Sequence, residues 1–284
     1  MEVSIGELIY YAHELGDFDD IDYLVISDAH YGNHLYSEQH FKRTLEFLKR
    51  PNAFAFLEGD LCECVTRNSK GEIHKQVGSP DDQADYMIEL LEPYKDKILG
   101  ICTGNHEARI EDVDISKKIA RAIGVPYRPE GMMLKISFGG GNEGHQNKPY
   151  VFWHYGTHGY GGARTKSAKA IKVERLSGWI NADLFTMSHD HVVNVAPDIL
   201  LEKDNRTFKE MRNGKYTGFT YGRLKAKRRM LVKTNAYLKW GGYSEMGGFP
   251  PTDLDTPVIR LLTPHSKRWK DLPDRPHQAI KVEA

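Results

Sequence analysis

Three apolar runs in the first part of the chain each end in a short polar turn. Residues 23–27, 53–57 and 98–102 read YLVIS, AFAFL and ILGIC. The stretches between successive turns exceed the dozen or so residues that a crossover between parallel strands requires, so each has room for one helix. Because open α/β sheets bind ligands at the carboxyl ends of their strands, we expect the three turns to meet at one edge.

The turns carry oxygen and imidazole donors, which suit borderline or hard divalent metals. In chain order these donors are Asp28, His30, Asp60, Asn105, His106 and Glu107. Two later stretches, residues 151–162 and 182–191, add His154, His158, His189 and His191. Asp28 and His30 are two positions apart, as are His189 and His191, so each pair leaves one face of an extended strand.

The order of these motifs resembles the calcineurin-like metallophosphoesterase superfamily. The motifs are Asp28-x-His30, Gly59-Asp60, Gly104-Asn105-His106-Glu107, His158-Gly159 and His189-x-His191. Each is common alone, but five in this order, each after an apolar run, form a specific pattern. The resemblance covers residues 23 to about 195 and, more faintly, to about 262. It implies an α/β fold, a four-layer α-β-β-α sandwich with two mixed sheets and a metal site at the carboxyl ends of the strands.

The resemblance also implies two divalent metal ions, with Mn expected and Fe, Zn, Co or Ni also suited to these ligands. It places Asp60 between the two ions, with a bridging hydroxide that attacks phosphorus. The first ion would be held by Asp28, His30, Asp60 and His191, and the second by Asp60, Asn105, His158 and His189. Asn105 is neutral, and this suits a site that attracts an anionic phosphate.

His154 and His158 compete for one ligand position. His154 lies inside the apolar run VFWHY, where a strand interior would keep it away from the turn. His158 precedes Gly159 in a glycine-rich turn, as in the His-Gly motif of the superfamily. We therefore predict that His158 is the ligand.

Catalytic roles are implied for His106, Asp28 and Asn105. His106 would assist the departure of the leaving oxygen, and Glu107 would orient His106. Substrate contacts are expected from Asn105, His106, Arg109 and Arg164, and Arg128 and Lys166 are further candidates. The chain departs from the usual Gly-His-Thr-His motif of the superfamily, because it has Ser188 in place of Gly and Asp190 in place of Thr. Both changes could alter substrate affinity, and neither removes a ligand.

These motifs predict a metal-dependent phosphoric ester hydrolase, and the details of the motifs resemble a bacterial and phage-type branch. We expect a phosphodiesterase or nuclease acting on nucleotides or nucleic acid. A phosphomonoesterase, including a protein phosphatase, is the enzymatic alternative. A non-catalytic metal-bearing scaffold and a nucleic-acid-binding module are the alternatives outside enzymology. The binding module would rest on residues 203–233, with eleven Lys or Arg and interleaved Tyr216, Phe219 and Tyr221. A solvated hairpin face is the competing interpretation of that segment.

Bulk composition limits the class of protein. The chain has 39 basic residues (Lys and Arg) and 39 acidic residues (Asp and Glu), so its formal net charge is zero. The molecule as a whole therefore has no net electrostatic attraction to nucleic acid or membrane. The three cysteines follow no disulfide or zinc-ribbon spacing. The acidic N-terminus is unlike a secretory signal, and no apolar run approaches the ~18 residues of a membrane span. We expect a cytoplasmic protein without membrane partners, and the oligomeric state stays open.

The pattern predicts one metallophosphoesterase domain over residues 1–284, with a core at about 23–196. A basic β-rich segment at about 203–262 is expected to complete the second sheet. Residues 4–15 are predicted as a helix capped by Ser4 and Glu7. Further helices are predicted over residues 37–49, 81–94, 115–123 and 164–176. Strands are predicted at 133–138 and 150–157, with a turn at 139–141, and residues 191–197 are expected to pair after the strand at 182–187.

Overall fold

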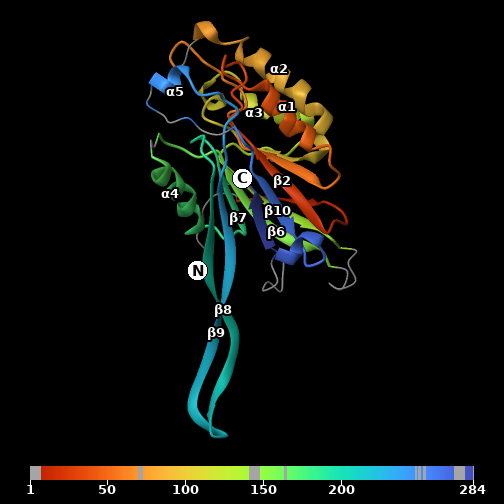
Figure 1. The fold of residues 1–284 in the computed structure, drawn as a ribbon, viewed down its shortest axis with the longest axis vertical. Coiled ribbons are helices and arrows are strands. Elements are labelled where there is room, and N and C mark those ends of the chain that lie inside the picture. The colour runs from red at the N-terminus through yellow and green to blue at the C-terminus, as the bar shows by residue number, and fades with distance from the viewer. Residues whose placement is uncertain are drawn as a thin grey trace.

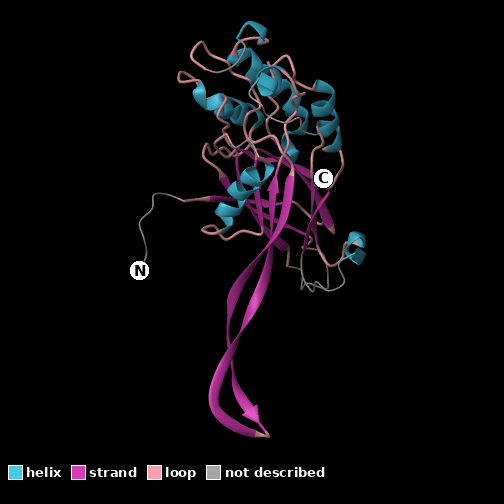
Figure 2. Cartoon of the chain, turned by 60° about the vertical axis from the view of Figure 1, so that its left-hand side comes forward, coloured by secondary structure: helices cyan, strands magenta, loops and turns pink. Residues whose placement is uncertain are grey.

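The computed structural model describes residues 8–69, 73–140, 148–162, 165–246, 248, 251, 254–271 and 279–283. Two β-sheets lie at the centre of the body, with helices on their outer sides, and a long two-stranded ribbon projects from one end (Figures 1 and 2). Within the described residues, no helix is both long and apolar enough to cross a membrane.

The five-stranded sheet supplies the first three turns. Its order is β11 (Ala279–Glu283), β10 (Val258–Leu262), β2 (Asp20–Ile26), β3 (Ala53–Leu57) and β4 (Ile98–Ile101). Strands β2, β3 and β4 are parallel, whereas β10 runs antiparallel to both of its neighbours. The carboxyl ends of β2, β3 and β4 therefore share one edge, as the sequence predicts.

The six-stranded sheet supplies the later turns and is also mixed. Its order is β1 (Tyr10–Glu14), β5 (Met132–Phe138), β6 (Tyr150–Thr157), β7 (Leu184–Met187), β9 (Lys215–Lys233) and β8 (Asn194–Arg212). Strands β6, β7 and β9 are parallel, and β5–β6 and β8–β9 are antiparallel pairs.

Three apolar clusters join four layers. The largest side chains between the sheets include Tyr23, Phe56 and Phe152. Helices α1 (Glu38–Phe47), α2 (Pro80–Leu91) and α3 (Ile115–Ile123) pack on the outer face of the five-stranded sheet. Helix α4 (Lys166–Ser177) covers the six-stranded sheet through Val173 and Leu176. The predicted α-β-β-α sandwich with two mixed sheets is confirmed. Within the described ranges, further helical segments are α5 (Gly242–Met246) and the 3₁₀ turns Ile73–Lys75, Glu92–Lys97, Glu107–Arg109 and Lys267–Asp271.

Local signals account for the helix ends. Ser79 accepts a hydrogen bond from the Asp82 backbone N–H, and the Asp82 carboxylate accepts one from the Ser79 N–H, so α2 begins with a capping box. Asp114 caps the first turn of α3, and Gly124 ends it in the left-handed conformation, as predicted.

Two predictions about secondary structure are wrong. Residues 10–14 form strand β1 rather than a helix, because they pair in parallel with β5 and Tyr10 packs edge-on against Trp153. Ser4 and Glu7 lie outside the described residues. The segment beginning at residue 191 does not pair with β7. Its strand, β8, pairs with β9, which lies between β7 and β8.

Candidate metal centre

The turns after five strands bring their side chains together at one edge of the sandwich. Backbone hydrogen bonds tie the turns to one another: the Asp28 N–H donates to Gly59 O at 3.0 Å, and the His30 N–H to Asp60 O at 2.9 Å. The His189 N–H donates to the Asp28 carboxylate at 3.1 Å, and this bond links the two sheets. The residues that meet here are Asp28, His30, Asp60, Asn105, His158, His189 and His191.

Five of these residues adopt the left-handed backbone conformation, which is uncommon for residues other than glycine. Their φ angles are 50° for Asp28, 51° for His30, 50° for Asp60, 70° for His189 and 50° for His191. Such conformations cost about 1–3 kcal/mol each and persist where the surrounding structure enforces them. Their concentration at one edge indicates turns that are shaped to aim side chains.

Two glycines allow the central turns to approach each other. A Cβ on Gly59 would lie 2.3 Å from the Gly104 nitrogen, and one on Gly104 would lie 2.1 Å from the Asp60 nitrogen. Neither distance is possible for a real side chain, so both positions require glycine. The contact places Asp60 next to the turn that carries Asn105 and His106.

Asp28, His30 and His191 form a first group whose ligand atoms all lie within 4.8 Å of one another. His191 Nε2 is 3.2 Å from Asp28 Oδ1 and 3.2 Å from His30 Nε2. His30 Nε2 is also 3.8 Å from Asp60 Oδ2. Asp60 therefore adjoins this group, as predicted for a shared carboxylate.

Asp60, His158 and His189 form a second group. His158 Nε2 lies 3.1 Å from Asp60 Oδ2 and 3.3 Å from His189 Nδ1. Asn105 Oδ1 is 3.0 Å from His158 Nε2 and 2.7 Å from His189 Nδ1. The structure thus brings together all the residues of both predicted ligand sets.

The donor arrangement fits divalent cations. Imidazole nitrogens of His30 and His191 face each other, as do those of His158 and His189. With metal–nitrogen bonds of about 2.0–2.1 Å, two imidazoles on one ion have their nitrogens roughly 3 Å apart, as found here. Asp28 Oδ1 is buried and has no well-directed hydrogen bond within the described part of the chain. An unsatisfied buried carboxylate oxygen among facing imidazoles is a site for positive charge.

Charge within the centre supports the same conclusion. Burial by itself would lower the pKa of His158, but the neighbouring Asp60 carboxylate outweighs it and raises that pKa to about 10. Burial would raise the pKa of Asp60, yet His158, His106 and His30 together hold it well below its usual range. The Asp60 carboxylate is therefore ionised at neutral pH and attracts cations.

The rings of two candidate ligands are held from behind by acceptors. His30 Nδ1 lies 3.1 Å from Glu63 Oε2, and His158 Nδ1 donates to Glu58 O at 2.9 Å. Such partners select the ring nitrogen that faces the metal and raise its basicity. Sequence reasoning missed both residues, and the three-residue spacing from Asp60 to Glu63 was the only available signal.

Glu107 holds the central turns rather than His106, contrary to the expectation. Its carboxylate accepts hydrogen bonds from the backbone N–H groups of Asp60 at 2.9 Å, Cys62 at 2.9 Å and Gly104 at 3.2 Å. Burial raises the pKa of Glu107 to about 7. This side chain therefore fixes the backbone on both sides of the Gly59–Gly104 contact.

His106 lies beside Asp60. Its backbone N–H donates to Asp60 Oδ1 at 2.7 Å, and its Nδ1 donates to Glu63 O at 2.8 Å. Nε2 is 3.9 Å from Asp60 Oδ2, and burial lowers the pKa of the ring to about 4. His30, Asp60 and His106 also satisfy ligand spacing. This geometry is compatible with a ligand role and with a role toward the substrate.

His154 lies in a different environment. Its Nδ1 is 2.9 Å from the Tyr23 hydroxyl, its Nε2 is 2.7 Å from Thr186 Oγ1, and burial lowers its pKa to about 3. A neutral ring with both nitrogens hydrogen-bonded inside the core is a structural residue. His154 is in none of the possible ligand groups found among the described residues.

The two departures from the usual motif have partners within the protein. Ser188 Oγ donates to the buried Glu58 carboxylate, as does Thr186 Oγ1. The Asp190 carboxylate accepts from Lys233 Nζ at 2.5 Å and Lys172 Nζ at 2.7 Å, behind the histidines. The turn is thereby anchored to β9 and α4.

The four basic residues expected to contact substrate lie in different surroundings. Arg109 follows His106 in a 3₁₀ turn and lowers the pKa of that histidine, although burial has the larger effect. Arg128 lies 3.6 Å from Glu130. Arg164 and the side chain of Lys166 lie outside the described residues.

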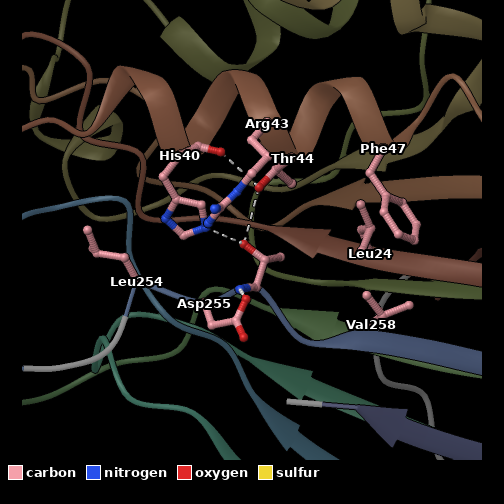
Figure 3. A pocket seen from close by; sticks show the side chains of 9 residues that line it. Leu24, His40, Arg43, Thr44, Phe47, Leu254, Asp255 and Val258 are labelled. Carbon is pink, nitrogen blue, oxygen red and sulfur yellow. Dashed lines mark hydrogen bonds between the residues drawn. The ribbon is translucent and has the colours of Figure 1, made fainter.

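A separate pocket of about 510 Å³ lies between α1 and residues 254–258 (Figure 3). Within it, His40 Nε2 is 3.0 Å from Thr256 Oγ1, and Arg43 and Phe47 line its wall. None of the candidate metal ligands lines this pocket.

No family model matches the chain, and no curated protein matches it. Among solved structures, it is similar to a conserved uncharacterized protein from Streptococcus pneumoniae that is described as a predicted phosphoesterase. The two share 11% identity with a TM-score of 0.34, and the match covers 93% of this chain and 98% of that one.

Exchanging each of the competing histidines for alanine should have opposite effects. His158→Ala removes a nitrogen that faces Asp60, so the purified protein should hold one metal ion fewer. His154→Ala should keep the metal content and lower the free energy of unfolding by about 2–4 kcal/mol, because it leaves a cavity and an unpaired Tyr23 hydroxyl. Elemental analysis and denaturant unfolding measure the two effects. The reverse pattern would assign the ligand to His154.

Removing the acceptor behind His30 should weaken metal binding without unfolding the protein. We expect Glu63→Ala to lower metal affinity by about 10–100-fold, with Glu63→Gln intermediate because it keeps an acceptor oxygen. Competition with a chromogenic chelator measures the affinity, and circular dichroism in chelator checks the fold. Unchanged affinity in a folded Glu63→Ala protein would show that the contact does not orient the ligand.

Proposed function

We propose that this chain is a metal-dependent phosphoesterase with two divalent ions, the first held by Asp28, His30, Asp60 and His191 and the second by Asp60, Asn105, His158 and His189. The observation that carries the proposal is the position of Asp60 beside two groups of facing imidazoles. We further infer membership of the calcineurin-like metallophosphoesterases, on the order of the five motifs along the chain. Manganese is the expected ion.

The reaction assigns distinct roles to these residues. Two bound divalent ions supply a water of lowered pKa and stabilise charge on the phosphoryl oxygens. Asn105 is exposed at the rim of the centre, where its amide can donate to a phosphoryl oxygen. His106 is 18% exposed and presents Nε2 toward Asp60, where it can protonate the leaving oxygen.

A phosphodiester is the substrate class that we propose. The ligands at the rim are open to solvent: the His191 side chain is 29% exposed, and Asn105 is exposed. A long or bulky ester can therefore approach the edge of the sheets from outside.

Chelation and metal replacement test the proposal as a whole. Activity on a nitrophenyl phosphodiester should disappear in chelator and return with Mn²⁺, and two ions per chain should be visible by anomalous scattering. Single- and double-stranded nucleic acids and a nitrophenyl monoester complete the panel. The absence of hydrolysis of every ester in metal-replete protein would refute the phosphoesterase proposal. Faster cleavage of the monoester would refute only the choice of phosphodiesters.

Exchanging His106 separates an acid from a ligand. His106→Asn should keep both ions and lower turnover by about 10²–10⁴-fold on an unactivated ester, because general acid assistance acts in the transition state. The loss should be much smaller with a nitrophenolate leaving group, which departs without a proton. Metal content is measured in the same preparation. Loss of an ion would make His106 a ligand, and equal losses on both esters would exclude an acid role.

A further inference from the structure

Most of the β8–β9 ribbon extends beyond the body of the protein (Figures 1 and 2). Strand β9 pairs with β7 only over Met230–Lys233, and β8, the last strand of the sheet, pairs with β9 alone among the described strands. A two-stranded hairpin on its own is marginally stable in water at best. A ribbon of this length therefore calls for a packing partner.

One face of the ribbon continues the core between the two sheets. Residues opposite each other in an antiparallel pair, and every second residue along a strand, share a face. Met230 and Val232 on this face are buried against the five-stranded sheet. Beside them and farther out, the same face carries an exposed apolar stripe, which comprises Val195, Pro197, Ile199, Leu201, Leu224 and Ala226 and is interrupted by Lys203 and Arg228.

The exposure of this apolar stripe is large. Ile199 is 54% exposed, Leu201 62% and Leu224 66%. The opposite face is more densely charged, with Glu202, Lys225 and Lys227 among its side chains. A ribbon whose exposed aliphatic side chains gather on one face is suited to burying that face.

The opposite net charges of the ribbon and the rest of the chain favour a second copy of the chain as the partner. Residues 198–229 contain ten Lys or Arg and four Asp or Glu, so the ribbon is positive by six charges. Of 39 residues of each sign in the chain, 29 basic and 35 acidic residues remain, so the rest is negative by six. A second copy of this chain thus offers both an identical apolar stripe and a body of opposite charge. A twofold axis makes any such patch self-complementary.

The ribbon is poorly placed to hold the substrate of its own chain. Strands β7 and β9 are parallel, and the metal centre follows the carboxyl end of β7. The free part of β9 precedes Met230, so it extends from the opposite, amino end. The stripe is also aliphatic, and the exposed rings on which bases could stack, Tyr216, Phe219 and Tyr221, lie nearer the tip and outside it. These observations favour a protein partner over nucleic acid.

We propose that the β8–β9 ribbon is a homodimerisation arm. Two arms pack face to face and antiparallel through their apolar stripes, so that each basic tip lies toward the acidic body of the other copy. The stripes supply the apolar centre of the interface, and the charges around the tips set its direction.

The association is measured by sedimentation velocity and light scattering from about 1 µM to about 100 µM, because a dimer is concentration-dependent. The wild-type chain should reach twice its 32.4 kDa mass. Leu201→Glu combined with Leu224→Glu should raise the dissociation constant about 100-fold or more, because it buries charge at the centre of the stripe. Val113→Glu, at an exposed apolar residue away from the ribbon, should leave the dimer intact.

A shortened arm provides the second variant. Leu200 and Lys227 are opposite each other, so residues 201–226 can be replaced by an Asn-Gly turn. This variant should be monomeric and should keep the wild-type metal content, which shows that the body has folded.

Three results would overturn the proposal. The first is a wild-type protein of single-chain mass at the highest concentration. The second is a dimer that persists in both arm variants. The third is a monomeric wild type that binds an oligonucleotide and loses this binding in the variants, which would assign the arm to nucleic acid. None of these measurements depends on hydrolysis, so the arm and the phosphoesterase proposal can fail separately.

Discussion

The candidate metal centre depends most on the position of one carboxylate, that of Asp60. Its Oδ2 lies 3.1 Å from His158 and 3.8 Å from His30, so it connects the two ligand groups. The backbone N–H of Asp60 donates a hydrogen bond to Glu107. The turn is also held by the contact of Gly59 with Gly104, which leaves no space for a side chain at either glycine. The ionised state of Asp60 follows from the imidazoles around it, which outweigh the cost of its burial. A change to any of these supports would move an oxygen on which both groups depend.

The centre also depends on how the two sheets pack. Asp28, His30, Asp60 and Asn105 come from the five-stranded sheet, whereas His158, His189 and His191 come from the six-stranded sheet. Close packing of the apolar layer between the sheets sets the separation of these groups. The buried bonds of Ser188 to Glu58 and of Asp190 to Lys233 then fix the last turn against both sheets. This arrangement explains why left-handed backbone conformations can persist there.

The same inter-sheet face continues into the β8–β9 ribbon, so one pattern of alternation produces both a core and an exposed surface. Where the five-stranded sheet covers it, Met230 and Val232 are buried; where that cover ends, Leu201 and Leu224 are exposed. A pattern of alternating apolar residues predicts a buried face in either case, and only the presence of a covering layer distinguishes them.

The sequence by itself determined the features that arise locally. Apolar runs followed by Asp28, Asp60 and Asn105 predicted parallel strands and their shared edge, and Gly124 marked the end of α3. Tertiary structure decided whatever depends on contacts between distant segments. Residues 10–14 became a strand because an edge of the sheet was available to them, although nearby capping signals favoured a helix. Glu63, Glu58 and Glu107 act through atoms brought close only by folding, and neither spacing nor composition reports such contacts. Periodicity and capping act within a few residues, whereas strand pairing and burial act across the whole chain, so only the folded structure could show which side chains meet.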